Sequence, residues 1–200
     1  MIYYYTKDTS SGLIYVTIAF LVYVIYLFTD SVLNLNKKTY TDTKTKLYNS
    51  ARWDEYIKMN ASDNAPLGIM MFDINGLKYA NDTYGHKAGD KIIVKFSEIL
   101  KNTFDESDFV CRWGGDEFAV IVKNADAEKM EGYIHSLINA ADEYNSTGVK
   151  PQLHFACGYV MSTEFPGMSG CELLEKADER MYGDKQEWYK KRIKLINKNA

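Results

Sequence analysis

Hydrophobic positions form one long uninterrupted run near the N-terminus and several shorter, periodic runs in the remainder of the chain. The long run, Leu13–Phe28, has Thr17 as its only clearly polar member and carries no charge. A helix of this length spans roughly 24 Å, and flanks from Ser10 to Ser31 extend it to the ~30 Å of a hydrocarbon core. Because the run is apolar on every side, we interpret it as a transmembrane helix.

Two other interpretations of this run fit less well. A cleaved signal peptide would have a basic region before the apolar stretch and a small-residue cleavage site after it. A helix or a pair of strands that packs on the core of a soluble domain usually shows an apolar and a polar side, whereas this run is apolar all round. Lys37 and Lys38 follow the run, whereas Lys7 and Asp8 precede it. This asymmetry predicts a single pass through the inner (cytoplasmic) membrane, with the C-terminal part in the cytoplasm.

The chain therefore divides into three predicted segments. Residues 1–30 are the N-terminal flank and the transmembrane helix, residues 31–41 form a juxtamembrane linker helix, and residues 42–200 form one domain. Within the domain, helical spacing predicts helices over 50–59, 75–84, 127–144 and 171–182, and a further amphipathic helix capped by Gly89 and Asp90. Short β-rich runs predict strands over 69–72, 109–113, 118–122 and 153–161. This order predicts an α+β domain, with helices covering an antiparallel or mixed sheet.

Composition narrows the class of protein. The 200 residues carry a formal net charge of −3, which argues against a nucleic-acid partner, because gripping phosphates requires clustered Lys and Arg. The three cysteines, Cys111, Cys157 and Cys171, form no CxxC pair, so neither a disulfide framework nor a zinc site is expected.

Candidate chemistry gathers at two places in the domain. Asp73 ends an apolar strand, and Asp116 and Glu117 follow the Gly114–Gly115 turn of a predicted hairpin. Carboxylates from a strand end and a neighbouring turn suit a hard divalent cation, and glycines let the backbone approach a phosphate closely.

The second place follows Asp73 along the chain. Lys78 could neutralise phosphate charge, while Asn81 and Asp90 could pair with the edge of a guanine. A polar turn followed by a capped helix explains the same residues without any ligand, and both interpretations remain open at this point.

Three sequence blocks resemble one family. Residues 114–118 read Gly-Gly-Asp-Glu-Phe and follow Arg112–Trp113. Residues 72–90 resemble the block D-x-D/N-x-x-K-x-x-N-D-x-x-G-H-x-x-G-D, and Ala177-Asp178, Met181-Tyr182 and Lys185 resemble a closing A-D-x-x-x-Y-x-x-K helix. A fixed string such as the first arises by chance in few chains of this length. From about Asp42 onward, the chain resembles the GGDEF-domain diguanylate cyclase family.

The resemblance implies a palm-like sheet, similar to ferredoxin-like and class III cyclase folds, and the condensation of two GTP into cyclic di-GMP and pyrophosphate. It implies Mg²⁺ or Mn²⁺ as cofactor and a homodimer, because each domain holds one GTP. By motif position, the metal ligands are Asp73, the Ile74 carbonyl, Asp116 and Glu117; Asp116, Glu117 and Lys78 are catalytic; and Asn81, His86, Asp90, Gly114, Gly115 and Lys185 bind nucleotide. Whether Asp116 acts as base or as ligand is left open.

Several positions depart from the family pattern. Lys46 stands in the opening turn, 42–51, where a glycine is usual, and would be strained at a positive φ. Tyr189 stands where an Arg is usual, with Lys190 or Lys191 as weaker substitutes. Asp105 replaces the Arg of the R-x-x-D product-inhibition motif that ends at Asp108, which predicts no feedback there.

These departures keep two other functions open. The first is a catalytically weak or inactive GGDEF domain that acts as a GTP-binding or protein-interaction signalling module. The second is a domain that only scaffolds a membrane assembly.

Overall fold

The computed structural model describes residues 2–59 and 65–199, which fall into two units, Met1–Tyr40 and Thr41–Ala200. The first unit is one helix, α1 (Ile2–Tyr40). Its stretch Gly12–Leu35 is long and apolar enough to cross a membrane, and its side chains are exposed. The predicted segment boundaries at residues 30 and 41 stay predictions.

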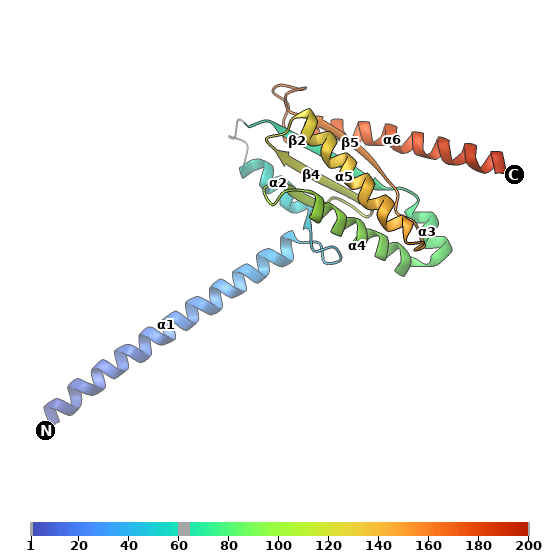
Figure 1. Cartoon of the computed structure of the whole chain (residues 1–200). Coiled ribbons are helices and arrows are strands. Elements are labelled where there is room, and N and C mark those ends of the chain that lie inside the picture. Colours follow the sequence, from blue (N-terminus) through green and yellow to red (C-terminus); the bar gives the residue numbers. More distant parts are fainter. Residues whose placement is uncertain (1, 60–64, 200) are drawn as a thin grey trace. The chain divides into compact units, whose positions relative to one another are not determined.

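The second unit is a five-stranded sheet with helices on both faces (Figure 1). Its elements are β1 (Tyr48–Asn49), α2 (Ser50–Met59), β2 (Leu67–Ile74), α3 (Leu77–Tyr84), α4 (His86–Thr103), β3 (Phe109–Arg112), β4 (Glu117–Lys123), α5 (Ala127–Ser146), β5 (Phe155–Met161) and α6 (Gly170–Asn199). The strand order is β1-β3-β4-β2-β5, with β1 parallel to β3 and the other neighbours antiparallel. The predicted α+β class, with helices covering a mixed sheet, is confirmed.

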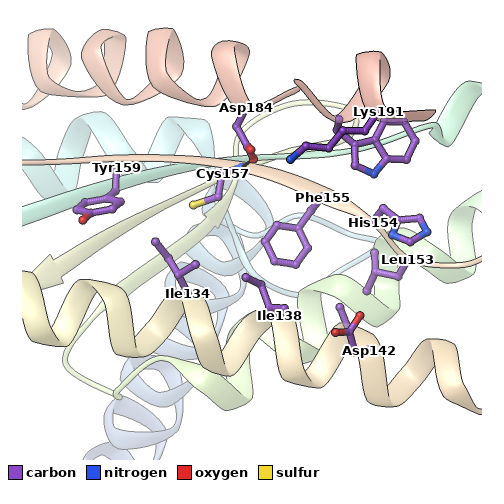
Figure 2. A pocket seen from close by; sticks show the side chains of 12 residues that line it. Ile134, Ile138, Asp142, Leu153, His154, Phe155, Cys157, Tyr159, Asp184 and Lys191 are labelled. Carbon is purple, nitrogen blue, oxygen red and sulfur yellow. Dashed lines mark hydrogen bonds between the residues drawn. The ribbon is translucent and has the colours of Figure 1, made fainter. Parts of the chain in front are cut away.

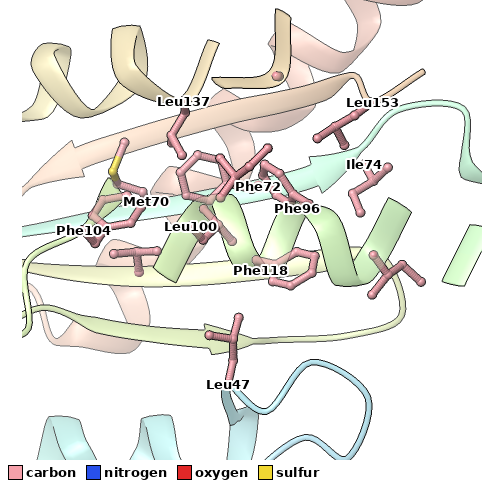
Figure 3. Close-up of a cluster of buried hydrophobic side chains, with 14 of the residues drawn as sticks. Leu47, Met70, Phe72, Ile74, Phe96, Leu100, Phe104, Phe118, Leu137 and Leu153 are labelled. Atoms are coloured by element: carbon pink, nitrogen blue, oxygen red, sulfur yellow. The ribbon is translucent and has the colours of Figure 1, made fainter. Parts of the chain in front are cut away.

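The first face of the sheet packs against α4 and α5. Alternate residues of the central strand β2 (Met70, Phe72 and Ile74) point into this core, where Phe72 meets Phe96 and Phe96 meets Phe118 in edge-to-face contacts (Figure 3). Because successive side chains of a strand point to opposite faces, the residues between them face the other layer. Burial on both faces explains why β2 reads as a continuous apolar run.

The second face packs against α2 and α6. Its core holds Ile69 and Met71 of β2, Trp53 of α2, and Leu173, Leu174, Ala177 and Met181 of α6. The helix α6 lies directly on β5 at Gly158, where an added Cβ would come within 2.2 Å of the Ala177 carbonyl oxygen. Glycine is therefore required there by the close approach of a helix and a strand.

Several predicted element boundaries are wrong. Helix α4 begins at His86 rather than after a Gly89–Asp90 cap, because the N–H groups of Ala88 and Gly89 already donate to the Gly85 carbonyl. Strand β5 begins at Phe155 rather than at residue 153, because the Asn145 side chain takes both backbone groups of Leu153, at 2.8 Å each. The two-residue strand β1 was missed, and α6 continues well beyond residue 182.

The opening turn has the strain that its sequence predicts. Lys46 has φ 62°, in the left-handed region where a side chain is costly. Two backbone hydrogen bonds close the turn, from Lys46 N to the Asp42 carbonyl (3.0 Å) and from Asp42 N to the Leu47 carbonyl (2.9 Å). The Asp42 carboxylate also accepts from the Thr45 N–H, the Thr45 hydroxyl and the Arg112 guanidinium. These bonds hold the turn in place despite Lys46.

Candidate functional site

Two carboxylates are brought together by the pairing of β2 with β4. Asp73 lies opposite Glu117 in the antiparallel register. Asp73 alternates with Ile69 and Met71 along β2, so its side chain belongs to the sheet face that α6 covers. The backbone supports this junction, since Ile74 N–H donates to the Asp116 carbonyl at 3.0 Å.

Helix α6 supplies a cation, Lys185, to this pair, and Lys185 lies 112 residues after Asp73 in the sequence. The Lys185 Nζ lies 2.5 Å from Asp73 Oδ2, and the Asp73 side chain is only 4% exposed. The other carboxylate oxygen, Oδ1, is buried and accepts no hydrogen bond. A buried charged oxygen without a partner is costly, so Oδ1 marks a place where a ligand would be stabilising.

The electrostatics of the cluster favour an added cation. Burial raises the pKa of Asp73, as does the charge of Asp116, against the opposing effect of Lys185. Burial also raises the pKa of Glu117, with further contributions from Asp116, Asp73 and Asp178. Burial alone would lower the pKa of Lys185, but its bond to Asp73 outweighs this and raises it. Negative groups therefore outnumber the single lysine.

The two glycines of the turn between β3 and β4 have different surroundings. An added Cβ on Gly114 would lie 2.7 Å from Glu117 Oε2, so a side chain there would displace that carboxylate. The Gly115 carbonyl accepts from the Arg112 guanidinium at 2.6 Å, yet an added Cβ on Gly115 would meet nothing within 4 Å. Nothing in the described chain demands glycine at 115, which is consistent with room kept for a bound molecule.

These residues fit a magnesium-like ion. Carboxylate and carbonyl oxygens are the donors that hard cations take, and Asp73 Oδ1 is a buried oxygen without a partner. Among the described residues, no three His, Cys, Asp or Glu side chains are gathered closely enough to enclose a metal. A divalent ion that is held by one or two protein carboxylates, with water and substrate phosphates as its other ligands, needs no such enclosure.

The residues predicted to contact guanine lie where α3 meets α4. The Asn81 amide oxygen lies 2.0 Å from the position that a Cβ on Gly89 would take, so glycine allows the two helices to touch. Asp90 follows in α4 and forms an ion pair with Lys44 of the opening turn. Lys44 is thus a neighbour of the predicted base site that the sequence analysis did not identify.

The other predicted nucleotide ligands lie at helix starts. Lys78 is exposed in the first turn of α3, and His86 is exposed as the first residue of α4. Helix α3 has no side-chain cap at Gly76, and the start of a helix is a position that favours an anion. The buried Asn75 side chain, without a hydrogen-bond partner, lines a cavity of about 190 Å³ beside this helix start.

A larger cavity, about 420 Å³, lies between α5, β5 and α6 (Figure 2). Its walls include Ile138, Phe155 and Trp188, and neither Asp73 nor Glu117 reaches it. The candidate site is therefore assigned by its charged groups and not by cavity size.

Two positions near the usual late Arg lie at or beside this cavity. Lys191 lines it, while Tyr189 packs edge-on against Trp188 with ring centroids 4.9 Å apart. Lys191 therefore lines a cavity that neither Asp73 nor Glu117 reaches.

The family model described as "Diguanylate cyclase, GGDEF domain" matches residues 39–191. The chain belongs to this GGDEF domain family. Diguanylate cyclase A of Treponema denticola is 31% identical over 132 residues, which is 65% of this chain and 35% of that protein. The resemblance seen in the motifs is confirmed.

Solved GGDEF domains share the fold. The coiled coil and GGDEF domain of DgcB from Caulobacter crescentus, in complex with c-di-GMP, superposes with a TM-score of 0.74 at 22% identity, covering 85% of this chain and 93% of that one. The membrane protein SH2145 of Staphylococcus haemolyticus is 24% identical, over 73% of this chain and 43% of that protein. The chain spans about a quarter to two fifths of the length of the first curated relatives that it matches.

At the product-inhibition motif, where this chain departs from the family pattern, the structure gives both aspartates partners within the domain. Asp108 is buried and accepts from Lys123 N–H (2.9 Å) and the Tyr133 hydroxyl (2.7 Å). Asp105 lies 3.4 Å from Lys129 Nζ. Asp108 therefore stabilises the fold, and Asp105 adds negative charge where the family has Arg.

Proposed function

We propose that the chain is a membrane-anchored diguanylate cyclase, which condenses two GTP into cyclic di-GMP and two pyrophosphates. The observation that carries the proposal is the cluster of Asp73, Glu117 and Lys185, with an unsatisfied carboxylate oxygen beside a glycine turn. Carboxylates and a lysine at a strand end suit phosphoryl transfer, in which positioning and charge stabilisation do most of the work.

Asp73 and Glu117, with the Ile74 carbonyl, would hold Mg²⁺ or Mn²⁺ together with water and substrate phosphates, and the Asp116 carboxylate would join them only when the ion is bound. When bound, the ion polarises phosphate oxygens and lowers the pKa of a coordinated hydroxyl. Lys185 holds the Asp73 carboxylate in place and, together with Lys78, offsets the negative charge of the triphosphate. Asp116, half-buried in the turn just before β4, is the group we assign to the attacking 3′-hydroxyl.

The base and the phosphates would be held by separate elements. Asn81 and Asp90 take the guanine edge, with His86 closing the pocket beside them. Gly114 and Gly115 would leave room along the nucleotide, since a side chain at Gly114 would displace the Glu117 carboxylate, whereas one at Gly115 would meet no described atom within 4 Å.

Two such domains must face each other, because each binds one GTP and each supplies one 3′-hydroxyl. A twofold dimer is the simplest arrangement that does this. The apolar stretch Gly12–Leu35 supports anchoring in a membrane, and Lys37 and Lys38 after it favour a domain in the cytoplasm. Confinement to a membrane raises the local concentration of partners.

The test uses the full chain in lipid vesicles with GTP and Mg²⁺, and detection of cyclic di-GMP by mass. We expect product from the unaltered chain and a loss of at least about 100-fold in Asp116→Ala. Glu131→Ala, which removes an exposed carboxylate from α5, is the matched control and should stay active. Specific activity should rise with the protein-to-lipid ratio, because the active form is a dimer.

The outcomes separate the proposal from its rivals. GTP binding without any product would favour a signalling module that binds GTP. Neither binding nor product would leave only a scaffolding role.

A further inference from the structure

Lys44 occupies a defined position in the opening turn. The turn is closed by Asp42 and Leu47 backbone bonds, and the Asp42 carboxylate is tied to Thr45 and Arg112. From this turn the Lys44 ammonium reaches Oδ1 of Asp90, 46 residues further along the chain. An ammonium group is therefore held beside a carboxylate at the junction of α3 and α4.

We propose that Lys44 is a specificity-determining residue that recognises O6 of guanine, acting together with Asp90. This inference rests on the proposed function, in which Asp90 binds the guanine edge. That edge presents O6, N1–H and the N2 amino group in a row. A carboxylate can accept from N1–H and N2–H, but it repels O6, because both are acceptors.

The Lys44–Asp90 pair supplies the donor that a carboxylate lacks. When the Lys44 ammonium lies beside one Asp90 oxygen, the pair presents one donor, the ammonium, beside two acceptors, the carboxylate oxygens. This pattern is the complement of O6, N1–H and the N2 amino group of guanine. Adenine presents an amino group and an N1 acceptor at the same places, so both members of the pair would be mismatched.

The pair is also weak enough to rearrange around a base. The Lys44 and Asp90 side chains are 36% and 50% exposed, and exposed ion pairs contribute little net stability. A guanine base can therefore bind to the Asp90 carboxylate without breaking a strong ion pair, and the Lys44 ammonium stays close to Asp90. Asn81, whose amide oxygen lies against Gly89, supplies a further polar group at the same junction.

The test measures binding of 3′-deoxy nucleoside triphosphates, which lack the attacking oxygen and cannot be condensed. The full chain in detergent with Mg²⁺ is titrated with the guanine, hypoxanthine and 2-aminopurine forms. The first two carry O6 and the third does not. In Lys44→Met we expect binding of the first two to weaken by about tenfold and binding of the third to change by less than about twofold.

Two further variants isolate the hydrogen bond from the charge. Lys44→Arg keeps a donor and should bind guanine within about threefold of the unaltered chain. Lys87→Met removes a positive charge from an exposed residue in the first turn of α4, and should affect all three bases equally.

Three results would overturn the inference. The first is equal or tighter guanine binding by Lys44→Met, which would mean that Lys44 competes for Asp90. The second is an equal loss for all three bases, which would mean a charge effect alone. The third is no guanine binding by the unaltered chain, which would overturn the proposed function as well. If guanine binds selectively but no cyclic product forms, the proposed catalysis fails and the role of Lys44 stands.

Discussion

Replacing Gly158 by alanine tests how closely α6 must lie on β5. An added Cβ would come within 2.2 Å of both the Ala177 carbonyl oxygen and the Met181 nitrogen, and within 2.8 Å of the Arg180 carbonyl carbon. All three are backbone atoms of α6, so no side-chain rotation can relieve the contact. Ordinary carbon contacts begin near 3.5 Å, so the helix has to move by roughly 1 Å.

The cost follows from what α6 buries. Forcing an extra methyl group into a packed core costs about 1–3 kcal/mol, and more where backbone must move. Because Leu173, Leu174 and Ala177 of α6 belong to the second core, we expect Gly158→Ala to lose about 3 kcal/mol in the free energy of unfolding. For a unit of this size, that corresponds to a fall in Tm of about 6–12 °C.

Gly183→Ala is the matched control. Gly183 lies in the same helix, and an added Cβ there would meet nothing within 4 Å. Removing a glycine from a helix interior should raise stability by about 1 kcal/mol.

The assay is thermal unfolding of the full chain in detergent, followed by tryptophan fluorescence. Trp53, Trp113 and Trp188, the only three tryptophans, all belong to the unit that starts at Thr41, so the signal reports that unit alone. A Gly158→Ala variant with a Tm within about 3 °C of the unaltered chain would refute the packing argument. A shifted α6 would also carry Lys185 away from Asp73, so under the proposed function the formation of cyclic di-GMP should fall even well below Tm.

Three further outcomes are expected. Lys46→Gly should raise the free energy of unfolding by about 1 kcal/mol in urea titration, because it relieves a side chain at φ 62°; no gain would contradict the strain. Burial alone would raise the pKa of Asp42, but bonds from Thr45 and Arg112 outweigh it and lower that pKa below its ordinary 3.8. That stabilisation is present above about pH 4 and is lost as pH falls through the lowered pKa, so Asp42→Asn should flatten the acid limb of the stability profile; an unchanged limb would count against it. Asp108→Ala should lower the free energy of unfolding by about 2–3 kcal/mol in thermal unfolding, because the Lys123 N–H and the Tyr133 hydroxyl lose this acceptor. Submicromolar cyclic di-GMP binding that vanishes in this variant would show a feedback site after all.

Local sequence patterns predicted much of the fold. The continuous apolar run of β2 and the glycine turn before β4 predicted a buried strand and a hairpin, because these signals depend only on neighbouring residues. The same holds for the helix at 50–59 and for the apolar stretch in α1. Boundaries went wrong where a distant or side-chain partner intervened, as when Asn145 took the backbone groups of Leu153.

The sequence by itself determined which chemical groups are available: the carboxylates at 73, 116 and 117, the glycines between them, and a lysine in the opening turn where the family usually has glycine. These are properties of motif spacing, which survive without knowledge of contacts. Only the tertiary structure decided which groups meet. Lys185 reaches Asp73 across 112 residues, Lys44 reaches Asp90 across 46, and Gly158 permits α6 to lie on β5. The physical reason is that such contacts depend on strand register and helix packing, which follow from burying both faces of one sheet together.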